Sequence, residues 1–308
     1  MIYTMTLNPS IDYYVYVDQF QVGGLNRMTK DLKYPGGKGI NVSRVLSRMG
    51  VKTKALGFVG GFTGSYIQNV LNQEDIATDF VQVEGDTRIN IKLKTGEETE
   101  INGAGPQISE VQLQELLNKI EKMKCHDTLI LAGSIPSSLD ADLYGVMMRL
   151  CLDRGIRVVV DTSGKAMLEL LQYKPFLVKP NQHELGEFFN VKIESLEDVI
   201  RYGRKLVERG AKHCIVSMAG DGAVLITSDQ AYAANVPQGK LINSVGAGDS
   251  LVAGFIGTFE LTGSIEKAFA YGVATGSATA FSTDLCTKAL IDELLPQIKL
   301  TQVEERTS

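Results

Sequence analysis

The sequence predicts an α/β protein in which helices cover both faces of a mostly parallel central sheet and a second, smaller β-sheet stands apart. Short runs rich in β-branched residues alternate with amphipathic helical stretches, which is typical of a parallel sheet built from strand–helix–strand units. Two further segments alternate apolar and polar residues with a period of two, which indicates strands with one exposed face. Together these patterns predict a three-layer α/β/α core with a small β-sheet attached.

The main sheet is predicted by units in which a strand leads through a loop into a helix. Four such units pair residues 53–59 with 65–73, 127–134 with 140–155, 157–164 with 165–173, and 175–181 with 183–189. Connections of this kind are right-handed and make the strands parallel. Because ligands of such sheets bind at the carboxyl ends of the strands, we expect the functional site in the loops that follow them. The polar end "QVEERTS" is expected to be frayed.

Residues 11–20 and 87–103 break this rhythm and predict the smaller sheet. The second segment places apolar side chains on one face and polar ones on the other, Ile89, Ile91 and Leu93 against Asn90, Lys92 and Lys94, as in an antiparallel strand. An exposed apolar sheet face is a liability for a single chain, so the sheet should cover a site as a lid or pair with a second copy. We expect a core of residues 1–10, 36–86 and 104–308, and a lid of residues 11–35 and 87–103 that contacts a partner in a homodimer.

Composition and charge limit the possible functions. The chain has 308 residues, of which 44% are hydrophobic and 22% charged, so it can form one large domain or a domain with an appendage. A formal charge of -5 without long blocks of one sign argues against a nucleic-acid binder. The start lacks a basic stretch followed by an apolar run, and no apolar run reaches about eighteen residues, so we expect a cytoplasmic protein.

The cysteines indicate neither a metal site nor a disulfide framework. They are scattered without a CxxC pair, and only three histidines could join them in a metal site. We interpret them as small buried apolar residues of a reducing compartment: Cys125, Cys151, Cys214 and Cys286.

The first glycine-rich motif, "YPGGKGINVSRVLSRMG", begins at Tyr34 and ends at Gly50. Its apolar residues follow helical spacing, so the three glycines at 36, 37 and 39 lie about the start of a helix. Lys38 is followed by Gly39, so the motif lacks the GxxxxGK[ST] spacing of a phosphate-binding P-loop. From these residues alone, a tight turn and a ligand site are equally good interpretations.

Three other stretches allow structural interpretations. A strand-to-helix turn explains the glycines of "GFVGGFTGS". In "SMAGDGAVLIT" the residues favour a hairpin with an Asp-Gly turn. In "KPNQHELGEF", Asn181 and Glu184 have the spacing of a helix capping box, which is as good an interpretation as a role near a metal.

The second glycine-rich motif, "NSVGAGDSLVAGF", points to phosphoryl transfer. Its apolar residues form a helix face, so Gly246, Ala247 and Gly248 lie at a helix start with free N–H groups and positive partial charge. Leu251 stands where GxGxxG needs a third glycine, which excludes a dinucleotide-binding turn. Helix capping alone explains Asp249 but not the three small residues before it. Backbone N–H groups beside a carboxylate suit a transferring phosphoryl group and the acceptor hydroxyl that attacks it.

The two motifs, in this order, resemble the signatures of the ribokinase-like sugar kinases of the phosphofructokinase-B type. The segments "TLNPSIDYYV", "TRINIKLK", "GEETEING", "AGSIP", "DTSG" and "VKPNQHE" extend the resemblance over essentially the whole chain. The resemblance implies a three-layer α/β/α core with a β-sheet lid. It also implies transfer of a phosphoryl group from ATP, with Mg²⁺, to the 6-hydroxyl of fructose 1-phosphate, which gives fructose 1,6-bisphosphate and ADP.

The resemblance also implies roles for individual residues. Asp249 would be the general base, kept ionised by the helix dipole, and the anion hole would be Gly246, Ala247 and Gly248. The sugar would contact Asp12, Gly37, Asn41 and Ser134, and its own phosphate would contact Arg27, Lys38 and Arg88. The nucleotide would contact Lys179, Asn181, Ser217, Gly220 and Gly222, while Glu184 would hold water on Mg²⁺. The small-residue stretch at 271–281 could wall the adenine, although close helix packing also explains it.

Alternatives remain open. Tagatose 6-phosphate and fructose 6-phosphate are alternative substrates, because sequence does not locate the hydrogen bonds that separate such isomers. A non-catalytic sugar-phosphate sensor is an alternative of another class, but a pure binder needs no base such as Asp249. A redox enzyme on a dinucleotide-binding fold conflicts with the missing third glycine. Without the resemblance, Arg88 would be taken as a solvated strand residue.

Overall fold

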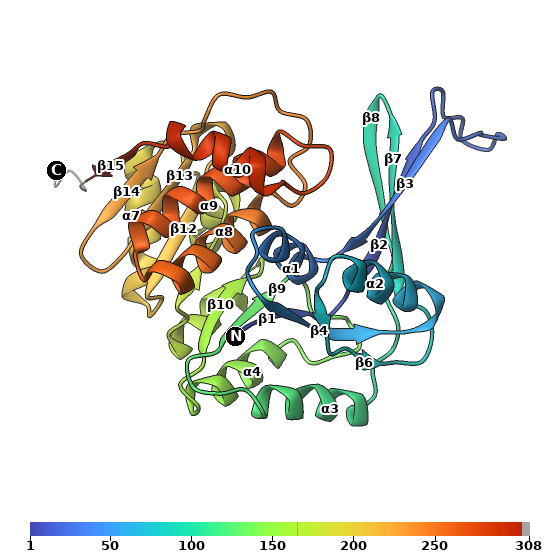
Figure 1. The fold of residues 1–308 in the computed structure, drawn as a ribbon, viewed down its shortest axis with the longest axis horizontal. Coiled ribbons are helices and arrows are strands. Elements are labelled where there is room, and N and C mark those ends of the chain that lie inside the picture. The colour runs from blue at the N-terminus through green and yellow to red at the C-terminus, as the bar shows by residue number, and fades with distance from the viewer. Residues whose placement is uncertain (165, 304–308) are drawn as a thin grey trace.

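The computed structural model describes residues 1–164 and 166–303, and a large β-sheet forms its centre (Figure 1). In that part of the chain the sheet has eleven strands: β1 (Ile2–Thr6), β4 (Thr53–Val59), β5 (Ala77–Thr78), β6 (Val81–Gln82), β9 (Thr128–Ala132), β10 (Arg157–Asp161), β11 (Leu177–Val178), β12 (His213–Ser217), β13 (Ala223–Ile226), β14 (Ala231–Ala234) and β15 (Leu300–Val303). Their spatial order is β15-β14-β13-β12-β11-β10-β9-β1-β4-β5, and β6 also pairs with β4.

Most of this sheet is parallel. All pairs from β5 through β4, β1, β9, β10 and β11 to β12 are parallel. The pairs β12–β13, β13–β14 and β14–β15 are antiparallel and form one edge. The mostly parallel sheet is therefore confirmed, and its antiparallel edge begins with the hairpin that the Asp-Gly turn favours.

Helices cover both faces of the sheet. One layer contains α1 (Lys38–Arg48), α2 (Gly61–Gln73), α8 (Ala247–Thr262), α9 (Ile265–Ala280) and α10 (Lys288–Leu294). The other contains α3 (Glu110–Glu121), α4 (Leu143–Leu152), α5 (Ala166–Leu170), α6 (Gln182–Phe189) and α7 (Leu196–Glu208). Short 3₁₀ turns follow α5 (Leu171–Tyr173), join β12 to β13 (Ala219–Asp221) and follow α10 (Leu295–Gln297).

Strand β9 shows why the core has three layers. All five of its residues are buried. Leu129 and Leu131 pack into the apolar cluster beneath one helix layer, and Ile130 packs into the cluster beneath the other. Because successive side chains of a strand point to opposite faces, a continuously apolar strand must be covered on both sides.

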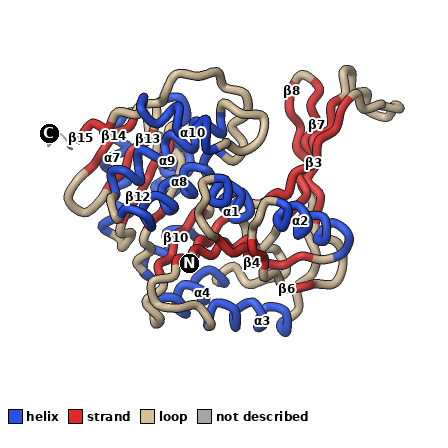
Figure 2. The backbone as a smooth tube through the Cα atoms, viewed as in Figure 1, coloured by secondary structure: helices blue, strands red, loops and turns tan. Residues whose placement is uncertain are grey.

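The smaller sheet stands away from the core (Figure 2). It consists of β2 (Ser10–Tyr16), β3 (Lys30–Gly36), β7 (Arg88–Thr95) and β8 (Glu97–Asn102), in the order β3-β2-β7-β8. The outer pairs are antiparallel, but β2 and β7 are parallel, so the expectation of antiparallel strands is wrong for the central pair. Both strands leave the core at the same edge and run outward, which makes them parallel.

The two faces of the smaller sheet differ from the simple expectation of a buried apolar face. The polar side chains of Asn90 and Lys92 are buried, and Asn90 lies in the cleft described below. On the opposite face Ile89 is 39% exposed and Ile101 is 57% exposed. The polar face therefore meets the cleft, whereas the apolar face is exposed only in part, because Ile11 and Leu93 on that face are buried.

Several local expectations need correction. Cys125 is exposed, in the segment between α3 and β9, whereas the other cysteines are buried. The helix expected over 165–173 consists of α5 and a 3₁₀ turn, and Lys165 lies outside the described residues. The expected frayed end begins inside β15, which pairs with β14, while residues 304–308 lie outside the described residues. Among the described helices, none is long and apolar enough to cross a membrane.

Candidate active site

A large cleft lies where the parallel strands of the main sheet end. Its volume is about 1760 Å³, which exceeds the roughly 300–1,000 Å³ of a pocket for one small ligand and suits two substrates. The expected site residues that line it are Asp12, Gly37, Lys38, Asn41, Arg88, Ser134, Lys179, Asn181, Glu184, Ser217, Gly220, Gly222, Gly246, Ala247, Gly248 and Asp249. The structure therefore brings together both glycine-rich motifs, the smaller sheet and the strand ends.

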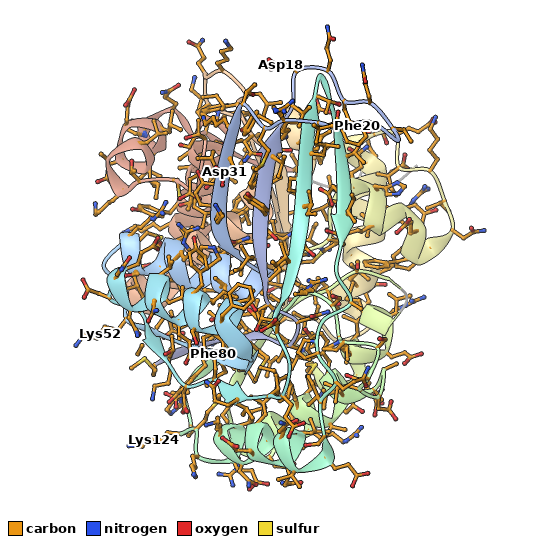
Figure 3. The ribbon with its side chains drawn as sticks, turned by 90° about the vertical axis from the view of Figure 1, so that its right-hand side faces the viewer. Asp18, Phe20, Asp31, Lys52, Phe80 and Lys124 are labelled. Atoms are coloured by element: carbon orange, nitrogen blue, oxygen red, sulfur yellow. The ribbon has the colours of Figure 1, made fainter. Side chains whose placement is uncertain are left out.

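Arg27 is the exception. It lies in the loop between β2 and β3, is exposed, and does not line the cleft formed by the described residues. Strands of seven residues, such as β2 and β3, extend for about 20 Å. Figure 3 shows Asp18 and Phe20 of the same loop at the outer end of the smaller sheet. The structure of a single chain therefore does not bring Arg27 to the cleft, and its contact with the substrate's phosphate stays a prediction.

Asp249 lies on the first turn of α8 and its side chain is buried. Burial raises the pKa of its carboxyl group to about 6, and the negative charge of Asp161 adds to the rise. Lys38, Asn41 and Lys179 act in the opposite direction, and Asn41 donates a hydrogen bond of 2.8 Å from Nδ2 to Oδ2 of Asp249. The carboxylate is therefore held by specific neighbours, and not by the helix dipole alone.

The three small residues before Asp249 differ in what they can offer an anion. Gly246 has a φ of 78°, which favours glycine, and it caps α8 without a side-chain hydrogen bond. The N–H of Ala247 donates to the carbonyl of Ser244 at 3.2 Å. Gly248 lies against Lys179, whose Nζ would be 3.1 Å from a methyl group at position 248. All three residues line the cleft, and of the three, Gly246 and Gly248 have N–H groups without a backbone hydrogen bond among the described residues.

Two lysines converge on a buried carboxylate beside this helix start. The Nζ atoms of Lys38 and Lys179 lie 3.2 Å and 3.5 Å from Oδ1 of Asp161, at the end of β10. Burial alone would raise the pKa of Asp161, but the two lysines lower it. Burial alone would lower the pKa of Lys38, but Asp161 and Asp249 raise it. Asp161 and Lys38 therefore stabilise each other's charged forms, and the side chains of both lysines meet at one buried carboxylate beside the cleft.

The smaller sheet contributes a polar group around Asp12. Oδ1 of Asp12 accepts hydrogen bonds from Oγ of Ser10 (2.8 Å) and from Nδ2 of Asn90 (3.1 Å). A methyl group at position 36 would lie 2.5 Å from the carboxyl carbon of Asp12, so Gly36 lets the two strands close around it. Among the described residues no hydrogen bond involves Oδ2 of Asp12, which can accept one from a ligand hydroxyl. Asp12 can thus accept hydrogen bonds from a sugar.

The glycines of the first motif act both as a turn and as part of the site. Gly37 has a φ of 117°, which only glycine adopts easily, and it lines the cleft. A methyl group at position 39 would lie 2.5 Å from the carbonyl oxygen of Met5, so Gly39 lets α1 pack closely on β1. Gly37 therefore fits both interpretations that the sequence left equal, and Gly39 is explained by packing.

Arg88 is anchored to backbone carbonyls at the base of β7. Its Nε and Nη2 donate to the carbonyl of Asn8 at 3.2 Å and 2.9 Å, and Nη1 donates to the carbonyl of Gly103 at 3.2 Å. A guanidinium group has five N–H donors, so two remain for a ligand in the cleft. Burial lowers its pKa, and Asp12 partly offsets this effect. Arg88 is therefore a fixed cation, unlike a solvated strand residue.

The far end of the cleft contains the residues expected to meet a nucleotide. Asn181 and Glu184 form the capping box of α6, with two hydrogen bonds of 2.8 Å, so their spacing has a structural cause. Oε1 of Glu184 is not part of this capping box and remains for a ligand or water. A methyl group at Gly222 would lie 2.0 Å from the carbonyl oxygen of Ala234, so that glycine is required by packing as well.

Sequence reasoning missed several residues of the cleft. Asp161 ends a predicted strand, which was a usable signal because such ends face ligands. Ser10 and Asn90 alternate with apolar neighbours, and only the orientation of the smaller sheet places them inside. One face of α9 also lines the cleft, through Val273, Gly276, Ser277 and Ala280, where the sequence suggested a wall but no site residue.

The described residues include no cluster of three or more His, Cys, Asp or Glu side chains that could hold a metal ion. Mg²⁺ usually keeps several waters and binds through one or two carboxylates together with substrate phosphates. Oδ2 of Asp161 is buried without a hydrogen-bond partner in the described part of the chain. A single unpartnered carboxylate oxygen, without a cluster of protein ligands, fits a Mg²⁺ ion that enters the cleft together with the phosphates of a nucleotide.

Comparisons with known proteins agree with this geometry. The model of the pfkB family carbohydrate kinases matches residues 5–291. The chain is 57% identical over 303 residues to 1-phosphofructokinase of Bacillus subtilis (strain 168), covering 98% of this chain and all of that one. It is 40% identical over 305 residues to D-tagatose-1-phosphate kinase of Bacillus licheniformis, again covering 98% of this chain and all of that one.

A solved structure extends the likeness to the fold. Phosphofructokinase-2 from Escherichia coli, in complex with substrates and products, matches with a TM-score of 0.91 and 30% identity over 96% of this chain and 98% of that chain. The mostly parallel sheet, the separate small sheet and the cleft between them are consistent with this match. The chain thus belongs to the pfkB family of carbohydrate kinases and is a phosphotransferase that acts on an alcohol group of a sugar.

Proposed function

We propose that this kinase transfers the γ-phosphoryl group of ATP to the 6-hydroxyl of fructose 1-phosphate, giving fructose 1,6-bisphosphate and ADP. The observation that carries the proposal is the position of Asp249. Its buried carboxylate lies beside the helix start at Gly246–Gly248, in a cleft large enough for two substrates. The identity to 1-phosphofructokinase of Bacillus subtilis supports the choice of sugar phosphate.

Asp249 accepts the proton of the attacking hydroxyl. With a pKa of about 6, its carboxyl group is mostly ionised at neutral pH yet basic enough to take the proton as the bond to phosphorus forms. Asn41 fixes one carboxylate oxygen, so the other is directed at the acceptor. The backbone of Gly246 and Gly248 stabilises charge on the transferring group.

The cations of the cleft divide between the two phosphate positions. Lys38 and Lys179 surround Asp161 next to Asp249, so we assign both to the transferring group and the phosphates behind it. Arg88, at the base of the smaller sheet near Asp12, is assigned to the phosphate that the sugar already carries. This revises the role expected for Lys38, while Arg27 lies away from the cleft of a single chain.

The nucleotide lies along Ser217, Gly220, Gly222 and the start of α6. Asn181 and Lys179 line this part of the cleft and would approach its phosphates, and the carboxylate of Glu184 would hold water on the Mg²⁺ that accompanies them. When bound, Mg²⁺ would neutralise part of the negative charge of the ATP phosphates. The face of α9 that lines the cleft would form a wall for the adenine base.

We also propose that the smaller sheet is a lid of residues 11–35 and 87–103 and that two lids pair in a homodimer in the cytoplasm. The outward face carries exposed apolar side chains, including Ile89 and Ile101, which a second copy would bury. Light scattering at micromolar concentration tests the pairing. The mass of a single chain would contradict it.

The decisive test of substrate is kcat/KM with MgATP for fructose 1-phosphate, tagatose 1-phosphate, tagatose 6-phosphate and fructose 6-phosphate. We expect a preference for fructose 1-phosphate of about 100-fold, which corresponds to about 2.7 kcal/mol of differential transition-state binding. Preference for tagatose 1-phosphate would favour the second candidate, which the 40% identity to D-tagatose-1-phosphate kinase supports. No transfer to any of the four, with tight sugar-phosphate binding retained, would indicate a sensor.

A further inference from the structure

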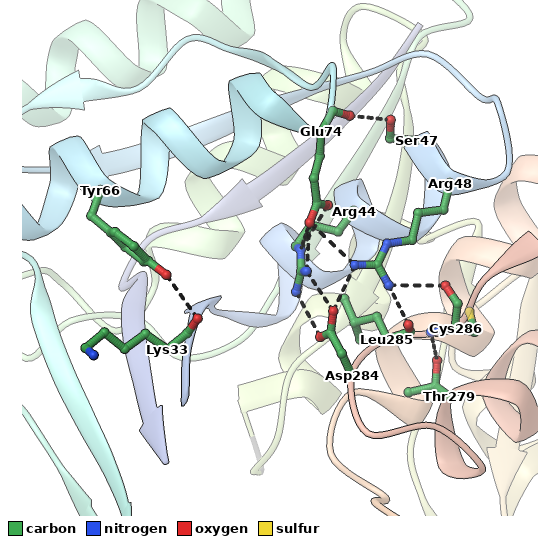
Figure 4. A network of polar contacts seen from close by, with 10 residues as sticks. All are labelled: Lys33, Arg44, Ser47, Arg48, Tyr66, Glu74, Thr279, Asp284, Leu285 and Cys286. Atoms are coloured by element: carbon green, nitrogen blue, oxygen red, sulfur yellow. Dashed lines mark hydrogen bonds and ion pairs between the residues drawn. The ribbon is translucent and has the colours of Figure 1, made fainter. Parts of the chain in front are cut away.

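A cluster of four charged side chains joins α1 and the end of α2 to the segment between α9 and α10 (Figure 4). Arg44 is almost fully buried, and its guanidinium contacts Glu74 at 2.8 Å and Asp284 at 2.9 Å. Arg48 contacts Asp284 at 2.8 Å and Glu74 at 3.4 Å. The cluster is electrically balanced, and both arginines share both carboxylates.

The cluster also fixes the backbone that follows Asp284. Nη1 of Arg48 donates to the carbonyls of Leu285 and Cys286, the latter at 3.3 Å. Burial alone would raise the pKa of Asp284, but the charge of Arg44 and the hydrogen bonds from Arg44 and Arg48 lower it. Segment 284–286 is thus held against α1 by side chain and by main chain together.

Two contacts lead from this segment to the start of α8. The side chain of Leu285 lies against Gly246, because a methyl group at position 246 would be 2.7 Å from its Cδ2. The N–H of Cys286 donates to Oγ1 of Thr279 at 3.0 Å, and Thr279 lies 2.7 Å from Oγ of Ser250. Ser250 in turn donates to the carbonyl of Gly246 at 2.8 Å.

The order of donors along this relay is determined by the number of protons. The single hydroxyl proton of Ser250 is used for Gly246, so Thr279 must donate to Ser250 and accept from Cys286. Thr279, Ser250 and Cys286 are all buried, where a broken hydrogen bond is costly. The relay therefore holds the carbonyl of Gly246, and with it the peptide units that follow.

We propose that Asp284 is a positioning residue for phosphoryl transfer, which acts by holding segment 284–286 so that Leu285 and the Thr279–Ser250 relay fix the helix start at Gly246–Gly248. The inference rests on the proposed role of that helix start as the anion hole. Asp284 does not line the large cleft; it lines a separate pocket of about 30 Å³, shared with Asp12 and Asn41, which is too small for a sugar phosphate, so we infer that it acts through other residues. Its loss should weaken stabilisation of the transition state while leaving ground-state binding of both substrates in place.

The test compares Asp284→Asn with Glu74→Gln. Both changes remove one carboxylate charge from the same two arginines, but Glu74 has no contact with segment 284–286 among its recorded hydrogen bonds. We expect D284N to lower kcat about tenfold with KM for fructose 1-phosphate and ATP within about twofold of wild type. E74Q should lower Tm comparably and leave kcat within about twofold.

A second variant, Thr279→Val, interrupts the relay without changing any charge. We expect kcat to fall about three- to tenfold at unchanged KM, and this result stands on its own where D284N does not fold. The inference would be overturned by equal kcat values for D284N and E74Q, or by a fall in the kcat/KM of D284N that comes from a higher KM. A wild-type kcat for T279V would overturn it as well. Asp249→Asn, assayed alongside, separates the two hypotheses: a fully active D249N contradicts the proposed function, whereas an inactive D249N with an unaffected D284N contradicts only the positioning role.

Discussion

The side-chain amide of Asn41 donates a 2.8 Å hydrogen bond to Oδ2 of Asp249, although 208 residues separate the two along the chain. Each lies in the first turns of its own helix, α1 and α8, and each belongs to one of the two glycine-rich motifs. Neither motif alone specifies a site. The contact joins them, so that the buried carboxylate has a fixed orientation in the cleft.

The first prediction concerns the carboxylate itself. Asp249→Asn preserves the size of the side chain and removes the group that accepts the hydroxyl proton. We expect kcat to fall roughly 10²- to 10⁴-fold with little change in KM, since general-base catalysis contributes about this much. Steady-state kinetics with fructose 1-phosphate and MgATP measure it, and a loss below tenfold would contradict the role.

The second prediction concerns the acid limb of the pH–rate profile. Burial and Asp161 raise the pKa of Asp249 to about 6, so kcat/KM should fall as pH drops through about 6 and the base becomes protonated. Asn41→Ala removes a hydrogen bond that lowers this pKa, so its acid limb should move to higher pH. Asn90→Ala is the matched control because Asn90 bonds to Asp12, and its limb should stay in place.

The third prediction uses Asp161, whose substitution should move the same limb in the opposite direction. Asp161→Asn removes a negative charge that raises the pKa of Asp249 and releases Lys38 and Lys179, which lower it. The limb should therefore move below pH 6. We also expect kcat to fall about 10- to 100-fold, because the two lysines lose the anchor that positions them. A shift of the acid limb to higher pH would contradict the effect assigned to these charges on the pKa of Asp249.

Some of these elements and site residues could be predicted from the sequence, and others could not. Strand β4 coincides with a predicted strand, and the capping box of α6 was readable, because both depend on local periodicity and spacing. The motifs around Asn41 and Asp249 were readable for the same reason. Local patterns thus identify elements and the residues at their ends.

Arg27 and the pairing of β2 with β7 could not be read in this way. Arg27 lies only fifteen positions after Asp12 in the sequence, which suggested a role near the sugar. Its position in space depends instead on how far β2 and β3 extend from the core. Likewise, alternation reveals two faces but not the direction of a neighbouring strand or which face meets the cleft. Both properties depend on contacts between distant segments.

The fourth prediction concerns the cation assigned to the sugar's own phosphate. Arg88→Met should raise KM for fructose 1-phosphate about 10- to 100-fold, because hydrogen bonds to charged groups contribute about 1.5–3 kcal/mol. KM for ATP should change little. Lys94→Met removes a charge from the same strand, where Lys94 pairs with Glu98 and does not line the cleft within the described chain. It should leave both constants unchanged, and an equal effect of the two variants would refute the assignment.

The fifth prediction concerns stability and rests on His213 in β12. Its ring packs against Phe176 with centroids 4.8 Å apart, and neither ring nitrogen has a hydrogen-bond partner among the described residues. Burial, with smaller contributions from Lys212 and Arg157, lowers the pKa of His213 to about 4. The unfolded chain has the ordinary value of about 6.5, so it binds a proton that the folded chain excludes between these two pH values.

The free energy of unfolding should therefore be fully retained above pH 6.5 and should decline as pH falls toward 4, by at most about 3 kcal/mol from this group. His213→Leu keeps an apolar contact with Phe176 and removes the titrating ring, so its stability should decline less over this range. His183→Gln, on the exposed side of α6, is the control and should follow wild type. Urea unfolding at several pH values measures the difference, and parallel curves for H213L and wild type would show that His213 does not carry the acid sensitivity.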